Sequence, residues 1–274
     1  MENSAGGIDR ISNLPDELLC RIISLLPTIK DAFSTTILSK RWGRPFRLLT
    51  DLFFKDESLL DKDAFIRFLR FVETVILSTK LIKTLHIECH FLHWQPKRYC
   101  IEHLQFLSPF NPITLWPTYF TFPTLVVLKL TNFIVPGNNI SVDLPSLKIL
   151  HLDHVRFANR ENFNKLIYGC PILEDLILSL SLTNELKTFT IIKGEGEGVE
   201  FKILSNLISA KMDTPHYVPF RAICNVQILK LGWDNVVEIL QGCPKLQILS
   251  VEKNAHSTTK LRSKTGNTQI MFLT

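Results

Sequence analysis

Histidine, cysteine and acidic residues gather most densely between residues 86 and 93 of this chain. Imidazole, thiolate and carboxylate groups, all of which zinc accepts as ligands, occur together in His86-Ile-Glu-Cys-His-Phe-Leu-His93. If the segment is a strand, His86, Glu88 and His90 share one face, while Cys89 and His93 point to the other. A tetrahedral site would need ligands from a second segment, and none with matching spacing occurs. We therefore expect ordinary strand residues and no bound metal.

A second segment with possible chemistry is the glycine-rich stretch Gly194-Glu-Gly-Glu-Gly198. It lacks the Gly-Lys-Ser/Thr end of a phosphate loop, and Glu195 and Glu197 would repel a phosphate, so we interpret it as a surface loop. The sequence has no Gly-x-Ser-x-Gly elbow and no His-Glu-x-x-His pair. These observations indicate a protein that is not an enzyme and that uses no cofactor.

Residues 9–42 read instead as a compact cluster of short helices with an unusually apolar surface. Pro15 fits the first turn of a helix, and Pro27 ends it because proline cannot continue a helix. The apolar residues of this helix form a belt broader than one buried face requires: Leu14, Leu18, Leu19, Ile22, Ile23, Leu25 and Leu26.

A second short helix is predicted to open at Thr28 and to run through Ile37. Thr28 and Asp31 have the spacing of a capping box, with Asp in place of the usual Glu. A unit of roughly 40 residues is marginally stable on its own, so its surplus apolar surface is expected to belong to a partner.

Three spaced motifs in this region resemble the F-box of plant-type F-box/leucine-rich-repeat proteins of the FBD type. They are Asp9-Arg-Ile-Ser-Asn-Leu-Pro-Asp-Glu-Leu-Leu19, Leu25-Leu-Pro-Thr28 and Leu38-Ser-Lys-Arg-Trp42, in that order. The resemblance implies binding to the Skp-type adaptor of a cullin-based ubiquitin ligase, with the rest of the chain selecting a protein substrate. It also implies adaptor contacts through Leu14, Pro15, Leu18, Ile22, Leu25, Leu26, Leu38 and Trp42.

The chain departs from the family pattern in two places. Ile29 is inserted between Thr28 and Lys30, where the family usually runs Pro-Thr-Lys-Asp. After Trp42 the sequence continues Gly43-Arg-Pro-Phe46 in place of a basic residue followed by a second Trp. One inserted residue would turn the second helix by about 100° unless the loop absorbs it.

Composition limits the remaining classes of protein. The chain has 274 residues, of which 46% are hydrophobic and 21% charged, as in folded globular proteins. Its start lacks the layout of a secretory signal, and no apolar run approaches the ~18 residues of a membrane span. We therefore expect no membrane association and a location in the cytoplasm, the nucleus or both. The six cysteines are expected to be reduced and mostly buried.

The net charge of +5 does not by itself predict nucleic-acid binding. Part of this charge comes from basic residues at 40–47, a domain junction, and part from those at 253–264, near the C-terminus. A nucleic-acid surface would spread such charge over one face between aromatic or groove-reading elements. We interpret these residues as a solvated surface and expect no nucleic-acid partner.

From residue 82 the sequence repeats the unit apolar-x-x-apolar-x-apolar. Successive units are mostly separated by 19 to 26 residues, the period of a leucine-rich repeat, in which each coil pairs a short strand with its neighbours. The unit at Leu186 starts only 13 residues after its predecessor and is read as an irregular turn or a stray match. The units are Ile82/Leu85/Ile87, Ile101/Leu104/Phe106, Leu125/Leu128/Leu130, Leu147/Leu150/Leu152, Leu173/Leu176/Leu178, Leu186/Phe189/Ile191, the weak Leu207/Ala210/Met212, Val226/Leu229/Leu231 and Leu246/Leu249/Val251.

Two of these coils share a Gly-Cys-Pro segment, at 169–171 and at 242–244. Apolar residues with helical spacing precede each segment, so the glycine is expected to end a helix that the proline cannot continue. Cys170 and Cys243 then occupy equivalent places, which indicates a buried packing role.

Residues between the core positions of each strand should line the opposite, concave face of the sheet, which solenoids present to protein partners. This face mixes both signs of charge and converges on no small ligand. We predict that it binds the substrate through His86, His103, Lys129, His151, Asp153, Asp175, Lys230 and Glu252.

The predicted fold is α plus α/β, with an N-terminal three-helix F-box followed by an irregular right-handed leucine-rich-repeat solenoid, a horseshoe. The predicted boundaries are a disordered N-terminus at 1–8, the F-box at 9–55, the solenoid at 56–254 and a disordered, non-repeat tail at 255–274. Relatives of this type usually continue into an FBD region, so we expect a shortened product whose last repeat is uncapped.

The sequence therefore favours the non-catalytic substrate-recognition subunit of a Skp-cullin-F-box ubiquitin ligase. The leading alternative keeps the fold but not the role: an interaction module, or a truncated decoy, that does not assemble a ligase. A basic nucleic-acid-associated protein is the weaker alternative.

Overall fold

The structure is a computed structural model that describes residues 11, 14–56, 61–89, 100–115, 117–179, 203–212, 220–231, 242–252 and 269–273. Its chain forms two compact units. The first comprises residues 1–88 and 99–101, and the second comprises residues 89–98 and 102–274.

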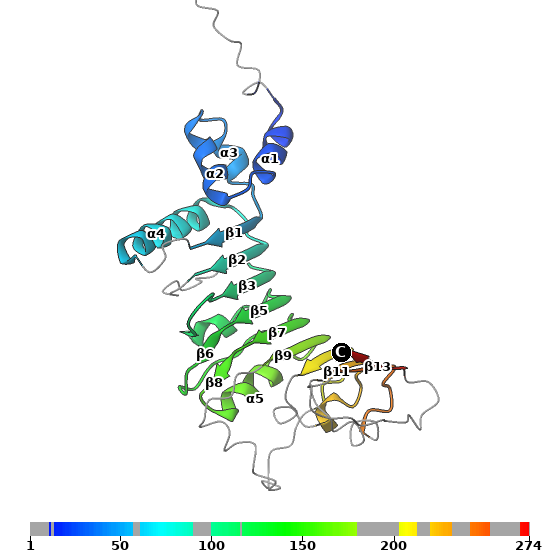
Figure 1. Cartoon of the computed structure of the whole chain (residues 1–274). Helices are drawn as coiled ribbons and strands as arrows, with labels where there is room; N and C mark the ends of the chain where they lie inside the picture. The colour runs from blue at the N-terminus through cyan, green and yellow to red at the C-terminus, as the bar shows by residue number, and fades with distance from the viewer. Residues whose placement is uncertain are drawn as a thin grey trace, which may run out of the picture. The chain divides into compact units, whose positions relative to one another are not determined.

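The described residues of the first unit form four α-helices, a 3₁₀ helix and a pair of parallel strands (Figure 1). Its elements are α1 (Asp16–Ser24), α2 (Ile29–Ser34), the 3₁₀ helix η1 (Thr35–Ile37), α3 (Gly43–Phe46), β1 (Asp51–Lys55), α4 (Lys62–Ser78) and β2 (Thr84–Glu88). The compact unit thus extends past residue 55, because α4 and β2 belong to it.

Thr28 caps α2 at the position that its spacing predicts. The backbone N–H of Asp31 donates to Thr28 Oγ1 at 3.1 Å, and the Thr28 hydroxyl donates to the Asp31 carboxylate at 2.7 Å. The inserted Ile29 is the first residue of α2 and is half-buried. The predicted helix through Ile37 is present, with its last turn tightened into η1.

Aromatic side chains hold the elements of the first unit together. Phe33 of α2 contacts Phe46 of α3 and Phe71 of α4, with ring centroids 5.4 and 5.5 Å apart. Phe71 also lies 6.0 Å from Phe54 of β1, in the same edge-on geometry that aromatic pairs prefer. One face of α4 is buried, and it carries Phe65, Phe68, Val72, Val75 and Ile76.

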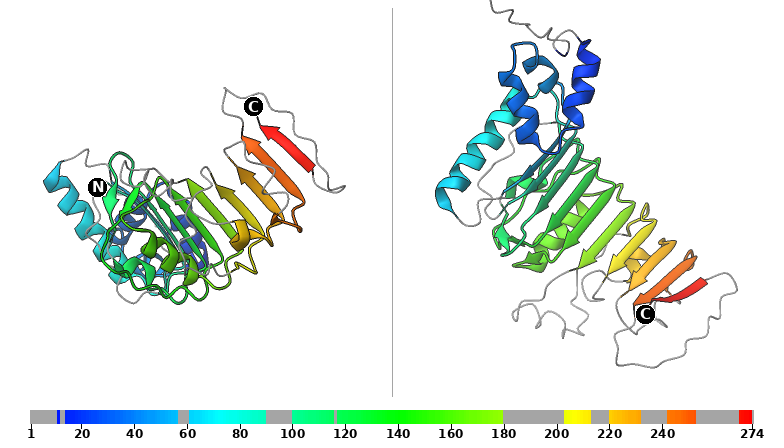
Figure 2. Two further views of the ribbon diagram at one scale, coloured as in Figure 1. Left: turned by 90° about the horizontal axis from the view of Figure 1, so that it is seen from below. Right: turned by 45° about the horizontal axis from the view of Figure 1, so that its top comes forward.

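The second unit is a parallel sheet with one strand from each repeat. Its neighbouring strands, drawn side by side in Figure 2, follow the order of the chain except where β4, β6 and β8 form a small sheet of their own. The main strands are β3 (His103–Leu107), β5 (Val127–Thr131), β7 (Ile149–Asp153), β9 (Asp175–Ser179), β10 (Ser209–Met212), β11 (Ile228–Leu231), β12 (Ile248–Glu252) and β13 (Gln269–Leu273). The small sheet comprises β4 (Ile113–Thr114), β6 (Phe133–Val135) and β8 (Arg156–Phe157).

The repeat pattern locates the core of the sheet. Every residue of the eight predicted triads that lie among the described residues is buried, including the weak unit at Leu207. The triad that begins at Leu186 lies outside the described residues. Parallel strands in register stack equivalent leucines above one another, so each coil completes the core of its neighbour.

Among the described residues, short helices occur in the return segments between strands: η2 (Pro117–Phe120), α5 (Arg160–Tyr168) and η4 (Phe220–Ile223). α5 ends at Gly169, as the Gly-Cys-Pro segment predicts. The φ angle of Gly169 is −74°, so the glycine is not required by a left-handed conformation. A Cβ at this position would overlap Val142 Cγ1 and lie 2.9 Å from Val142 Cβ. Close packing between neighbouring coils therefore explains this glycine.

The predicted packing role of the two equivalent cysteines is confirmed. Cys170 and Cys243 are both buried, and their thiols lie near the carbonyl oxygens of Leu166 and Ile223. Burial raises the pKa of Cys170 to about 12 and that of Cys243 to about 11. The helix predicted before Gly242 lies outside the described residues apart from Gly242 itself.

The predicted C-terminal tail contributes one strand to the sheet. Residues 269–273 form β13, which pairs in parallel with β12 so that Ile248 stands opposite Gln269. This part of the chain therefore continues the ladder of the solenoid.

Candidate functional site

The first candidate site is an apolar patch on the helices of the first unit. Leu18 and Ile22 of α1 and Leu25, which caps its C-terminus, recur at the spacing of one helical face and are all exposed. An adjacent face of α1 carries Leu19 and Ile23, which are buried. The broad apolar belt thus divides into a packed face and an exposed face.

Two further exposed apolar residues, Ile37 and Leu38, lie at the end of η1. We refer to Leu18, Ile22, Leu25, Ile37 and Leu38 as the α1/η1 patch. Leu25 is 75% exposed and Leu38 is 70% exposed, so these side chains contribute almost nothing to the core of the unit. Of the other predicted adaptor contacts, Pro15 is exposed, and Leu14 and Leu26 are half-buried.

Trp42 is placed differently from the other predicted adaptor contacts. Its side chain is only 4% exposed, so it is part of the core of the first unit. An ion cluster lies nearby: Arg41 and Arg44 reach Asp16 at 3.4 and 3.7 Å, and Arg41 also donates to the carbonyl oxygen of Leu14. These contacts tie the start of α1 to the segment that ends the F-box motif.

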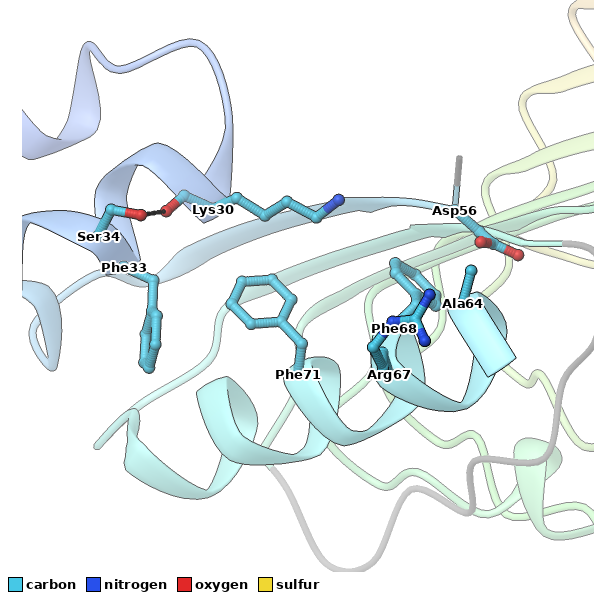
Figure 3. A pocket seen from close by; sticks show the side chains of 8 residues that line it. All are labelled: Lys30, Phe33, Ser34, Asp56, Ala64, Arg67, Phe68 and Phe71. Atoms are coloured by element: carbon cyan, nitrogen blue, oxygen red, sulfur yellow. Dashed lines mark hydrogen bonds between the residues drawn. The ribbon is translucent and has the colours of Figure 1, made fainter. Parts of the chain in front are cut away.

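An open pocket of about 570 Å³ lies in the first unit beside α2, β1 and α4 (Figure 3). Phenylalanine rings form its apolar wall, and Lys30, Arg67 and the buried Asp56 bring charge to it. Among its described lining residues, the Ser34 hydroxyl donates to the carbonyl oxygen of Lys30 at 2.8 Å and is not paired with a base. Its lining residues are Lys30, Phe33, Ser34, Asp56, Ala64, Arg67, Phe68 and Phe71.

The second candidate site is the face of the main sheet opposite the leucine core. Strand register places the central residues of successive strands side by side, and we call this line the middle row. The middle row comprises Gln105, Lys129, His151, Ile177, Lys211, Lys230 and Ser250. A second line, the upper row, comprises His103, Val127, Ile149, Asp175, Ser209, Ile228 and Ile248.

Four side chains from four neighbouring strands meet where the two rows adjoin. His151 Nε2 lies 3.0 Å from Asp175 Oδ2, and Ser209 also hydrogen-bonds to Asp175. These hydrogen bonds, with that from His151 the largest effect, lower the pKa of the Asp175 carboxyl although partial burial opposes the shift. The charge of Lys129 acts in the same direction. The sheet therefore gathers Lys129, His151 and Asp175, three of the predicted substrate-binding residues.

The remaining predicted substrate-binding residues are more scattered. Asp153 accepts a hydrogen bond from His154 at 2.7 Å, and His103 and Lys230 are exposed. His86 belongs to the first unit, where its ring lies 4.4 Å from that of Phe53 and burial lowers the pKa of its imidazole. Glu252 lies in β12, and its side chain is outside the described part of the chain.

The residues between the core positions were predicted to line an accessible face of the sheet. This prediction is wrong at Ser250, which is buried. The sequence analysis also missed Ser209 and Lys211. The triad Leu207/Ala210/Met212 is weak, so the residues between its members were not included in the predicted binding face. The spacing of the repeat was the signal that locates them. Asn132, at a φ of 67° after β5, was missed as well; its amide donates to the carbonyl oxygens of Ser108 and Phe110.

Of the possible metal ligands around residue 88, His86, Glu88 and Cys89 belong to the described residues. His90 and His93 lie outside the described residues. Within the described ranges, no group of three His, Cys, Asp or Glu side chains is placed to hold a metal ion. Among the helices that the structure describes, none combines the length and the apolar character needed to cross a membrane.

Two protein-family models match this chain, one over the N-terminal helices and one over the repeats. Residues 11–44 match the F-box domain and residues 146–171 match a leucine-rich repeat, which defines an F-box/leucine-rich-repeat protein and confirms the predicted fold. One FBD-associated F-box protein of Arabidopsis thaliana is 30% identical over 282 residues, which cover 94% of this chain and 68% of the relative. Another is 37% identical over 186 residues, which cover 61% of this chain and 42% of the relative. The chain belongs to the plant FBD-associated F-box proteins, as its N-terminal motifs predict.

The chain spans about half the length of several of these curated relatives, with coverages of 54%, 45% and 42%. The matched regions include the F-box helices, whose exposed apolar residues form the α1/η1 patch. The leucine-rich-repeat match at 146–171 covers β7, which carries His151 of the middle row.

Proposed function

We propose that this protein is the substrate-recognition subunit of a Skp-cullin-F-box ubiquitin ligase. In this role the F-box binds the Skp-type adaptor, and the repeats hold a protein substrate on the concave face of their sheet. The protein itself carries out no chemistry; it raises the local concentration of a substrate lysine beside the ubiquitin-loaded enzyme. We place this activity in the cytoplasm, the nucleus or both.

The observation that carries the proposal is the division of α1 into a packed and an exposed apolar face. Leu19 and Ile23 already fill the core, so Leu18, Ile22 and Leu25 are not needed for folding. Exposed apolar residues of this number on so small a helical unit mark a protein-binding surface. The match to the F-box domain over residues 11–44 supports a Skp-type adaptor as the partner.

Co-purification with a plant Skp-type adaptor tests the proposal. The double variant Leu25→Glu/Leu38→Glu places two charges on the α1/η1 patch and is expected to abolish capture. Leu77→Glu is a matched control, because Leu77 of α4 is 76% exposed and lies outside the patch. Capture by the wild type and by the control, but not by the double variant, is the expected result.

Failure of the folded wild-type chain to capture any adaptor would overturn the ligase role. It would favour the alternative of an interaction module or decoy, which keeps the repeats but does not assemble a ligase. Circular dichroism of each variant would show that a loss of capture reflects binding and not unfolding.

A further inference from the structure

A smaller pocket of the first unit lies beside β1, and we call it the β1-edge pocket. Its volume is about 260 Å³. Apolar side chains make up most of its wall, and among its described lining residues the only charged ones, Lys30 and Lys55, are both basic. The described lining residues are Pro27, Thr28, Ile29, Lys30, Phe53, Phe54, Lys55, Phe68 and Phe71.

The backbone of β1 presents hydrogen-bonding groups on the side away from β2. In the strand order of the sheet, β1 stands at the end, beside β2. The backbone N–H of Asp56 donates to the carbonyl oxygen of Glu88 on the β2 side. Alternate residues of a parallel pair bond to the partner strand, so the N–H and C=O groups of Phe53 and Lys55 point outward. Such groups on an edge strand are a template for pairing with another chain.

Lys30 supplies the pocket with a cation that can meet an anion. Figure 3 shows its side chain extended from α2 past Phe71. Lys30 is exposed, and no salt bridge joins it to another residue in the described part of the chain. Lys55, by contrast, pairs with Glu88 at 3.6 Å. The pocket thus places an available ammonium group beside an apolar wall.

The residue by which this chain departs from the family pattern contributes to the wall. Ile29 is the first residue of α2, is half-buried and lines the pocket. Its neighbour Thr28 uses its hydroxyl to cap α2 and to donate to Asp31. The inserted residue therefore adds an apolar side chain next to Lys30.

We propose that the β1-edge pocket binds the C-terminus of a partner polypeptide whose last side chain is apolar. The terminal carboxylate pairs with Lys30, and the last side chain packs against the phenylalanine rings. The backbone of the partner hydrogen-bonds to the outward groups of Phe53 and Lys55. Main-chain pairing at a sheet edge supplies affinity, and the side-chain pocket supplies specificity. This inference goes beyond the proposed function, because the pocket belongs to the first unit and not to the concave face of the repeats.

The shape and charge of the pocket select this partner from others. A basic segment would meet two lysines of like charge. A nucleic acid carries a phosphate at every nucleotide, whereas the pocket offers one available cation beside an apolar wall. An acidic residue inside a chain has no apolar group on the same Cα. A C-terminal apolar residue carries the anion and the apolar side chain on one Cα, as the pocket requires.

Fluorescence anisotropy with the full chain tests the inference. The probe is a fluorescein-labelled eight-residue peptide of Gly and Ser that ends in Phe with a free carboxylate. One comparison peptide has a C-terminal amide, a second ends in Ser, and a third continues for two Gly residues after the Phe. Unlabelled N-acetylphenylalanine serves as a competitor that has the same terminal group but no peptide chain to pair with β1.

The peptide with a free terminal Phe is expected to bind most tightly. Lys30→Gln should weaken its binding roughly fivefold, the order expected for one exposed ion pair. Ile29→Ala and Phe53→Ala should weaken it as well, and Phe53 is 48% exposed, so its loss leaves the fold intact. Lys80→Gln, at an exposed lysine outside the pocket, is the control and should leave the affinity unchanged.

Four results would overturn the inference. They are the absence of saturable binding of the probe, equal binding of the amide or of the peptide that ends in Ser, equal binding of the peptide that continues past Phe, and affinities unmoved by the pocket substitutions. Competition by N-acetylphenylalanine at the affinity of the whole peptide would also count against it, because the edge of β1 would then contribute nothing. Circular dichroism of each variant shows that a weaker affinity does not come from unfolding.

Discussion

His151 and Asp175 join two neighbouring strands of the sheet through their side chains, with Nε2 and Oδ2 3.0 Å apart. The two residues are offset in register, because Asp175 stands opposite Ile149 and His151 stands opposite Ile177. The bond is therefore diagonal, and it ties the upper row to the middle row. Residues 24 positions apart in the chain meet because one repeat has been completed between them.

This pair gives the stability of the protein a defined dependence on pH. The hydrogen bond from His151 lowers the pKa of Asp175 in the folded state, so the ionised carboxylate contributes stability above its unfolded pKa of about 3.9. That contribution is lost as the pH falls through the lower folded value. Because the Asp175 side chain is 31% exposed, we expect less than about 1 kcal/mol from it.

Urea unfolding at pH 7, 5 and 3 measures this effect in the wild type and in Asp175→Asn. The variant should be less stable at pH 7, and the difference should shrink at pH 3. Asp143→Asn, a change at an exposed aspartate, provides the control. A difference between wild type and Asp175→Asn that is constant with pH would contradict the account.

Trp42 should affect folding rather than adaptor contact. Because its side chain is buried in the first unit, Trp42→Ala should cost about 3–5 kcal/mol through the cavity that it leaves. Thermal melting followed by circular dichroism checks the change, with Leu38→Ala as the comparison at an exposed position of the α1/η1 patch. A Trp42→Ala protein that melts like the wild type but no longer captures adaptor would show that the indole binds the partner directly.

Gly169 should be intolerant of any side chain, and the cause can be tested by a compensating change. Gly169→Ala places a Cβ against Val142, an overpacking that typically costs 1–3 kcal/mol. Val142→Ala in the same chain removes the atom that the new Cβ overlaps and should restore part of the loss. Urea midpoints of the two single variants and the double variant form a mutant cycle. Strictly additive effects would mean that the contact with Val142 is not the cause.

Asn162 should be a large contributor to the stability of its coil. It is 1% exposed, and its amide donates at 2.8 Å to the carbonyl oxygens of both Pro136 and Asn138. Asn162→Ala leaves those groups without their donor, which costs about 1–3 kcal/mol. Asn206→Ala is the control, because exposed Asn206 donates only one bond that the structure records, to Pro171 at 3.2 Å. Equal losses of stability in the two variants would contradict the role of burial.

The cysteines should react with a thiol reagent in an order set by burial and pKa. Cys100 is exposed and should react first at pH 8. Cys170 and Cys243 should react slowly, because burial both blocks access and raises their pKa values to about 12 and about 11, which leaves little thiolate. Stopped-flow absorbance with wild type, Cys100→Ser and Cys170→Ser assigns the phases. Rapid labelling of Cys170 in the folded protein would show that its coil opens readily.

Local sequence patterns were sufficient to predict the helices and strands and the residues that form the core. Thr28 and Asp31 located the start of α2, and the spacing of triads such as Leu147, Leu150 and Leu152 located strands and their buried faces. Both signals are short-range: a cap involves residues three apart, and a strand alternates its side chains with a period of two. The F-box motifs likewise lie within one continuous segment.

Tertiary contacts decided which of the predicted site residues are available and which meet. Trp42 lies next to exposed residues in the sequence, yet its side chain is buried in the folded unit. In the sequence, Gly169 suggests a helix end in the left-handed conformation. In the structure, a glycine is required because Val142 of another coil leaves no room for a Cβ. Lys129, His151 and Asp175 come together only through the register of three strands, and Lys211 joins their face only once β10 has paired with β9. The sequence by itself determined the periods that form each coil, whereas the stacking of coils determined the site, because residues a repeat apart become neighbours only in the folded sheet.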